Sequence, residues 1–91
     1  MTALQSQIKQ FPSRYREQVH WAWRAVYEGS KGYSIGSLEQ TPLEAAEEEG
    51  LTVLSEYGDT GLVVCADDGD RIVAISDVGG AWAVDITEAL A

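Results

Sequence analysis

Residues 62–76, LVVCADDGDRIVAIS, hold two short apolar runs separated by an Asp-Gly turn. Asp68-Gly69 between apolar runs is a signal for a tight hairpin, because these two residue types accept the backbone angles that such a turn requires. A connection this short forces the flanking strands to be antiparallel. The stretch therefore predicts a β-hairpin with strands at 62–66 and 71–76.

Two further strands extend this hairpin. Residues 51–57 precede it and residues 81–87 follow it, each across a turn that contains glycine. Along 81–87, Trp82, Val84 and Ile86 fall on one face, which is the alternation of a half-buried strand. The second part of the chain therefore predicts a four-stranded antiparallel meander.

The first part of the chain has helical periodicity instead. Leu4, Ile8 and Phe11 are spaced as one face of a short helix, which Pro12 interrupts. Pro42 occupies the first position of another helix, because it follows a capping threonine and precedes a glutamate at the third position after the cap. The sequence therefore predicts helices at both ends of residues 1–50.

A long helix is expected between them, from a cap at Ser13 to Glu28, with Gly29 as its stop. Its apolar stripe consists of Tyr15, Val19, Ala22, Trp23 and Val26. Trp21 falls on the other side of this helix, together with Glu17, Arg24 and Glu28. We expect the first helix or the glycine-rich loop to cover Trp21, the alternative being an aromatic anchor for a partner.

The helix that begins with Thr41 as its cap is expected to reach Glu49 and to stop at Gly50. Residues 37–40 have a similar capping pattern and predict a short turn of helix. The complete pattern predicts an α+β fold in a single domain, residues 1–91, with a helical part at 1–50 and a sheet at 51–91. Two or three N-terminal helices, plus the short turn, pack on a four-stranded antiparallel meander and bury one of its faces.

Length and composition limit the class of protein. A chain of 91 residues, 45% of them hydrophobic, can build one modest core and is not mainly disordered. No apolar run approaches the roughly 18 residues of a membrane span, and residues 1–5 lack a secretory signal. Cys65 is the only cysteine and lies within an apolar run, so we expect a buried thiol and a cytoplasmic protein.

The charges are separated along the chain. Residues 1–38 have five basic and two acidic residues, a net charge of +3, whereas residues 39–91 have one basic and 13 acidic residues, a net charge of −12. The total of −9 argues against direct binding of nucleic acid, whose footprint on a protein is basic. The acidic excess therefore belongs to the helix at 41–49 and to the predicted sheet.

Part of this acidic set lies where helix stability favours the opposite sign. Glu44, Glu47 and Glu48 share one helix face, and like charges at that spacing destabilise a helix by about 0.2–0.5 kcal/mol per pair. The helix dipole also disfavours carboxylates in the last turn. A solvated face is the simpler interpretation, but the near absence of basic residues favours a surface for a basic partner. The predicted partner-binding residues are Glu44, Glu47, Glu48, Glu49, Glu56, Asp67, Asp68 and Asp70.

Enzyme and metal signatures are missing from the sequence. His20 is the only histidine, and the glycine-rich residues 29–32 lack the spacing of a phosphate loop. The acidic residues 67–70 lack the ligand order of an EF-hand. We therefore expect no catalytic activity, no metal and no cofactor.

In size, layout and acidic surface the chain resembles the anti-CRISPR proteins of phages and mobile elements. It resembles those directed at type I surveillance complexes, type I-C among them. The acidic set that carries this resemblance is Glu44, Glu47, Glu48, Glu49, Asp67, Asp68 and Asp70. The resemblance implies a monomeric DNA mimic in the cytoplasm of a bacterial host. Its partner would be the DNA-engaging large subunit of the complex, where it would block recognition of target DNA.

Three other functions fit the same composition. An immunity protein or antitoxin that neutralises a basic toxin, such as a nuclease, would need the same electrostatics. A small enzyme acting through carboxylates would need a concave pocket that holds acids of raised pKa. An accessory domain would have no specific partner.

Overall fold

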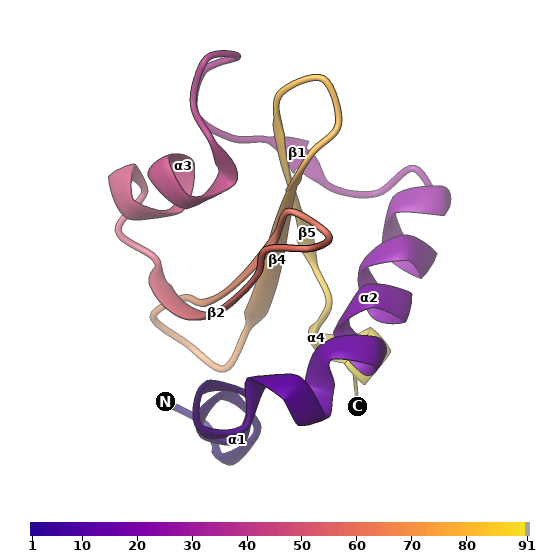
Figure 1. Ribbon diagram of the computed structural model, residues 1–91, viewed down its shortest axis with the longest axis vertical. Helices are drawn as coiled ribbons and strands as arrows, with labels where there is room; N and C mark the ends of the chain where they lie inside the picture. Colours follow the sequence, from indigo (N-terminus) through magenta and orange to yellow (C-terminus); the bar gives the residue numbers. More distant parts are fainter. Residues whose placement is uncertain (91) are drawn as a thin grey trace.

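The computed structural model describes residues 1–90, which form three layers, with a sheet between two helical layers (Figure 1). The elements in chain order are α1 (Ala3–Gln10), α2 (Pro12–Glu28), β1 (Tyr33–Ser34), α3 (Pro42–Glu48), β2 (Thr52–Tyr57), β3 (Leu62–Ala66), β4 (Ile72–Asp77), β5 (Ala81–Asp85) and α4 (Thr87–Leu90). The predicted α+β class and antiparallel sheet are confirmed.

The sheet has five strands in the order β1-β5-β4-β3-β2, so the predicted four-stranded meander is present and one strand was missed. The central hairpin of β3 and β4 forms around residues 67–71, with Cys65 opposite Val73. In β2 the register shifts by one residue between Val53 and Ser55. Such a bulge twists and blunts the edge of a sheet.

The missed strand, β1, lies within the segment that was expected to be a glycine-rich loop. Tyr33 pairs with Ala83 and Ser34 pairs with Trp82 at the edge of β5. Gly32 makes this approach possible, because it has a φ of +119° and an added Cβ would lie 2.7 Å from the carbonyl oxygen of Ala83. Only a residue without a side chain brings the chain so close to β5.

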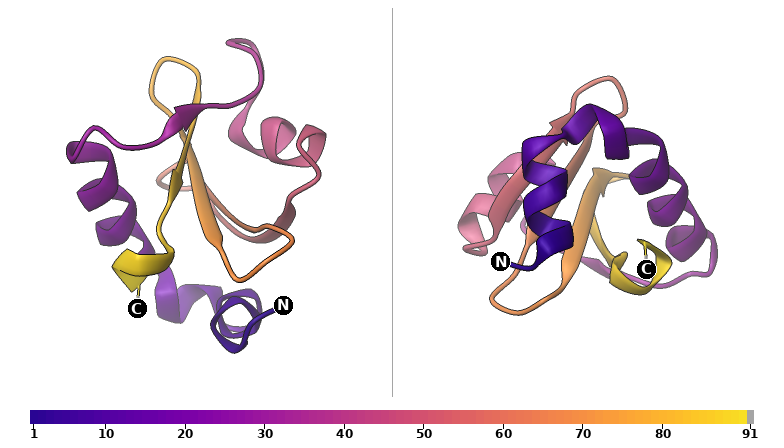
Figure 2. Two further views of the ribbon diagram at one scale, coloured as in Figure 1. Left: turned by 180° about the vertical axis from the view of Figure 1, so that it is seen from behind. Right: turned by 90° about the horizontal axis from the view of Figure 1, so that it is seen from below.

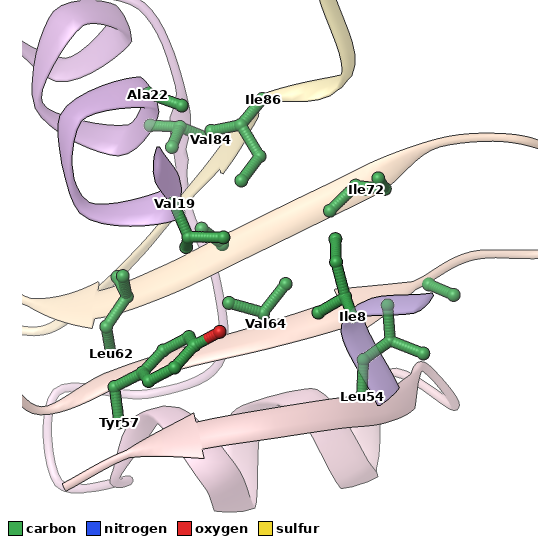
Figure 3. Close-up of a cluster of buried hydrophobic side chains, with 12 residues drawn as sticks. Ile8, Val19, Ala22, Leu54, Tyr57, Leu62, Val64, Ile72, Val84 and Ile86 are labelled. Carbon is green, nitrogen blue, oxygen red and sulfur yellow. The ribbon is translucent and has the colours of Figure 1, made fainter. Parts of the chain in front are cut away.

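Both faces of the sheet are buried, which corrects the expectation of one buried face. The α2-side core combines α1 and α2 with one face of the strands (Figure 3) and contains Ile8, Val19, Ala22, Leu54, Tyr57, Leu62, Val64, Ala66, Ile72, Ala74, Val84 and Ile86. The α3-side core contains Ile35, Ala45, Ala46, Val63, Cys65, Val73, Ile75, Ala81 and Ala83. Every residue of β3 is buried, as an uninterrupted apolar run requires when helices cover both faces.

Several element boundaries shift by one residue from prediction, and a helix cap, a short turn and the end of the last strand differ more clearly. Ser13 does not cap α2, which begins at Pro12 without a side-chain cap, because proline is preorganised for the first helical turn. Residues 37–40 form a turn rather than a helix, closed by a hydrogen bond from the Gln40 amide to the Ser37 carbonyl. The last strand ends at Asp85, whose carboxylate accepts hydrogen bonds from the Thr87 amide and hydroxyl and so starts α4.

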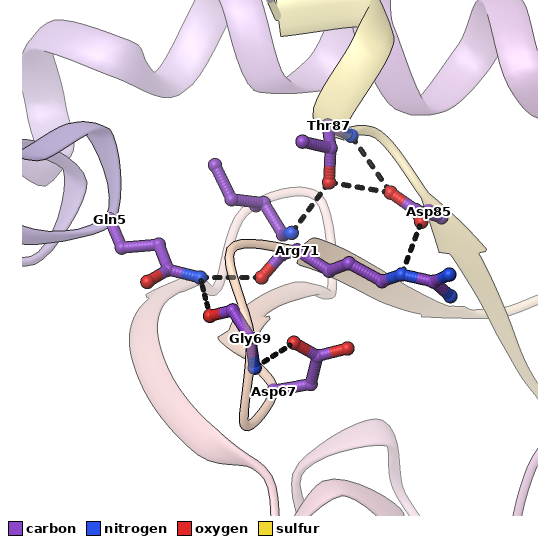
Figure 4. A network of polar contacts seen from close by, with 7 residues as sticks. Gln5, Asp67, Gly69, Arg71, Asp85 and Thr87 are labelled. Atoms are coloured by element: carbon purple, nitrogen blue, oxygen red, sulfur yellow. Dashed lines mark hydrogen bonds and ion pairs between the residues drawn. The ribbon is translucent and has the colours of Figure 1, made fainter. Parts of the chain in front are cut away.

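A buried glutamine joins α1 to the hairpin loop between β3 and β4 (Figure 4). The Gln5 side chain is fully buried, and its amide nitrogen donates to the carbonyl oxygens of Arg71, at 2.6 Å, and Gly69, at 3.4 Å. Its oxygen accepts from the Thr2 amide at 2.7 Å, which completes a capping box at the start of α1. Each polar group of this side chain therefore has a partner, as burial demands.

Replacing Gln5 with alanine is expected to lower the free energy of unfolding by about 2 kcal/mol, because the Gly69 and Arg71 carbonyls would lose their donor. Gln7→Ala is the matched control, since Gln7 is exposed on the same helix. Urea unfolding of both variants measures the difference. Equal losses would show that the contact with the hairpin loop contributes nothing.

Candidate functional site: an acidic surface

The predicted acidic residues of α3 all face solvent. The Thr41 hydroxyl accepts from the Glu44 amide and the Glu44 carboxylate accepts from the Thr41 amide, so the predicted capping box is formed. Ala45 and Ala46 are fully buried against the sheet. This packing turns the exposed carboxylates of α3 and its C-cap outward, at Glu44, Glu47, Glu48 and Glu49.

The loop between β3 and β4 carries the second acidic group. Asp67 is half-buried and accepts a hydrogen bond from the Gly69 amide at 2.9 Å, which holds the turn (Figure 4). Asp68 and Asp70 are exposed. Because Gln5 anchors the same loop from α1, these two carboxylates extend from a fixed turn.

Tyr33 is influenced by carboxylates of both acidic groups. Its pKa is raised, first by burial and then by the carboxylates of Asp85, Glu49 and Asp67, while Arg71 opposes them. Glu49 follows α3 and Asp67 begins the hairpin loop, so the C-terminal end of α3 and this loop both act on one phenol. We call the set of eight predicted residues, with Asp85, the acidic surface.

Glu56 lies at the opposite end of α3. It pairs with Val63, which belongs to the α3-side core, and so lies on the same face of the sheet. With Thr41 and Leu43 it lines a hollow of about 270 Å³ at the beginning of α3. The acidic surface therefore follows the length of α3.

Within residues 1–90, none of the eight predicted residues has an ion-pair partner. The ion pairs there join Arg16 to Asp59, Arg24 to Glu28 and Arg71 to Asp85. Three of the eight do have structural hydrogen bonds: Glu44 in the capping box, Asp67 in the turn, and Glu48, which accepts from the Gln40 side-chain amide. Glu47, Glu49, Glu56, Asp68 and Asp70 make no side-chain hydrogen bond or ion pair in the part of the chain described.

Two residues on this side of the sheet, Asp85 of the acidic surface and its neighbour Tyr33, were not singled out from the sequence. Asp85 lies on the α3 side of the sheet opposite Val73, with one carboxylate oxygen 3.7 Å from Arg71 Nε (Figure 4). Tyr33 is 52% exposed and pairs with Ala83 on the same face. The alternation along 81–87 implies that Asp85 lies on the face opposite Trp82, Val84 and Ile86, but no local signal indicated that β1 would bring Tyr33 to the same face.

The other residues considered from the sequence lie elsewhere. Cys65 is fully buried, and burial raises the pKa of its thiol to about 12. Trp21 is 59% exposed, so the expectation that a neighbouring segment covers it is wrong. Across residues 1–90, no group of three or more His, Cys, Asp or Glu side chains is placed to hold a metal ion. No helix there is long and apolar enough to cross a membrane.

What the acidic surface offers chemically is a group of exposed carboxylates with one neighbouring cation, Arg71, which pairs with Asp85. Such a set of carboxylates binds basic groups through charge-assisted hydrogen bonds and long-range attraction. Comparison with known proteins adds no identification, since no protein-family model, curated protein or solved structure matches the chain.

Proposed function

We propose that the chain is an acidic inhibitor that acts as a DNA mimic. It occupies the basic groove with which a type I CRISPR surveillance complex engages target DNA, and the type I-C complex is the first candidate. The observation that supports this proposal is the set of exposed carboxylates on α3 and the hairpin loop that have no ion-pair partner within residues 1–90. Lysine and arginine residues that bind DNA are spaced for a row of phosphates, and a row of carboxylates can replace it.

The position of these carboxylates supports a binding role over a stabilising one. Glu47 and Glu48 end α3, and Glu49 is its C-cap, where the helix dipole disfavours negative charge. Four residues of the acidic surface make side-chain hydrogen bonds or ion pairs within residues 1–90, and five make none. These five leave their charge available to a partner, which suits fast, salt-sensitive association with a basic protein.

Reversing Glu47 to lysine is expected to weaken binding to the purified surveillance complex roughly tenfold at low salt. The same change is expected to leave stability unchanged or raise it by about 0.3–1 kcal/mol, because a cation suits the end of a helix. Adding Glu49→Lys should enlarge the loss. Binding is measured by competition with labelled duplex target DNA over a salt series.

Glu88→Lys is the matched control, because Glu88 is also exposed on a helix but belongs to α4 on the other side of the sheet. Its effect is expected to be small, and the salt dependence of binding should decrease only in the Glu47 variant. The proposal fails if both variants bind alike, or if duplex DNA does not compete. Capture of a basic nuclease in place of the complex would support an immunity protein.

A further inference from the structure

The outward side of α2 carries a second surface with its own charge pattern. Arg14, Glu17, Trp21, Arg24 and Glu28 follow one another at spacings of three and four residues, so they form one stripe along the helix. All five are exposed, although the aromatic residue at the centre is of a type that proteins usually cover. This α2 stripe lies on the layer opposite α3 (Figure 2).

Trp21 stands between two hollows. One, of about 480 Å³, lies between α2 and α4 and is bounded by Ala25 and Leu90. The other, of about 250 Å³, is bounded by His20 and Thr60. The Arg24 guanidinium lies over the indole ring, 5.7 Å from its centre, which holds the ring in place on the helix surface. A protruding ring beside a hollow on the same face is suited to self-association, because each copy can fill the hollow of the other.

Each half of the α2 stripe has a basic residue followed by an acidic one, so positions at similar distances on either side of Trp21 carry opposite charges. From the N-terminal end the order is Arg14, Glu17, then Trp21, then Arg24, Glu28. When a second copy of the stripe lies antiparallel, Arg14 meets Glu28 and Glu17 meets Arg24, in both directions. These contacts would extend the ion pair that Arg24 and Glu28 already make within each helix, at 2.8 Å. When the second copy lies parallel, each charge meets its own kind. The pattern therefore selects an antiparallel pair with Trp21 at its centre.

We propose that the α2 stripe binds the α2 stripe of a second copy of this chain, antiparallel and around a twofold axis near Trp21. The stripe belongs to the segment 1–38, whose net charge is +3, so the pair brings together the least acidic surfaces of two acidic chains. The acidic surfaces stay on the outer sides of the dimer, because the sheet separates them from α2. The inference is independent of the proposed function and replaces the expectation of a monomer.

Sedimentation equilibrium of the full chain, from about 10 μM to about 1 mM, is the test for a dimer of this small size. Trp21→Ala is expected to raise the dissociation constant at least tenfold, because a central aromatic residue dominates an interface. Circular dichroism establishes that each variant is folded. Phe11→Ala is the matched control, because it removes another exposed aromatic side chain that lies outside the stripe.

A charge exchange tests the orientation. Glu17→Arg alone, or Arg24→Glu alone, is expected to weaken the dimer, since each places like charges opposite each other. The double exchange, Glu17→Arg with Arg24→Glu, restores the opposite charges across the pair but not the Arg24 contacts with Trp21 and Glu28. It is therefore expected to bind more tightly than either single variant. A chain that sediments as a 9.9 kDa monomer at every concentration would overturn the proposal. A dimer that is indifferent to Trp21→Ala, or whose double exchange binds no more tightly than the single variants, would also overturn it.

Discussion

Replacing Gly32 with alanine is expected to lower the free energy of unfolding by about 4 kcal/mol. The new methyl group would lie 2.5 Å from Trp82 Nε1, 2.7 Å from the Ala83 carbonyl oxygen and 2.7 Å from Val84 Cγ1. Two of these atoms belong to β5 side chains and the third to its backbone, so the strand itself must move. The φ of +119° adds strain that an alanine cannot relieve.

Gly50→Ala is the control for this variant. Gly50 also has a positive φ, of +75°, but an added Cβ would meet no atom within 4 Å. Its substitution therefore costs backbone strain alone, about 1 kcal/mol. Urea unfolding measures both losses, and faster hydrogen exchange at the Ile35 amide, which donates to the Ala81 carbonyl, reports the release of β1 from the sheet. Equal losses in the two variants would mean that the close approach of β1 to β5 is not required.

Raising the pH above 9 is expected to destabilise the protein through Cys65. Burial raises the pKa of this thiol from 9.0 to about 12. Below pH 9 both the folded and the unfolded chain keep the proton, whereas above it the unfolded chain loses the proton and the folded chain keeps it. The free energy of unfolding therefore decreases by about 1.4 kcal/mol per pH unit, a total of about 4 kcal/mol by pH 12.

Cys65→Ala isolates this contribution, because the alanine variant has no thiol to ionise. Urea unfolding between pH 8 and pH 11 should show a steeper decrease for the original chain than for the variant, on top of a constant loss from the smaller side chain. Burial also raises the pKa of Tyr57, but that tyrosine is common to both proteins and cancels in the comparison. Parallel curves would contradict the raised pKa of the thiol.

The sequence was most informative where local chemistry decides the structure. The capping box at Thr41 and the stop at Gly50 define α3 in the structure as they did in the sequence. The apolar run at 62–66 is a strand with the same bounds. Each of these features depends on neighbouring residues and on side-chain types that favour one conformation.

The features that were missed depend on contacts between distant segments. Tyr33 and Ser34 have no strand pattern of their own and become β1 because Gly32 lets them reach β5. The second covered face of the sheet follows from Ala45 and Ala46, which are small enough to bring α3 close. Exposure of the predicted carboxylates could be anticipated from charge alone, whereas their approach to Tyr33 could not, because it requires β1.

The two cores have a practical consequence for anyone who handles this protein. α1 and α4, near the two ends of the chain, both lie on the α2 side of the sheet (Figure 1). A dye, an affinity tag or a tether to a solid support attached near α4 therefore leaves the acidic surface free. The same group attached near α1 leaves α3 free but lies beside the hairpin loop, because Gln5 bonds that loop. A chain immobilised near α4 presents the carboxylates of both α3 and the hairpin loop to solution, whereas attachment near α1 crowds Asp68 and Asp70. A difference in binding kinetics between the two attachments would therefore measure the contribution of the hairpin loop.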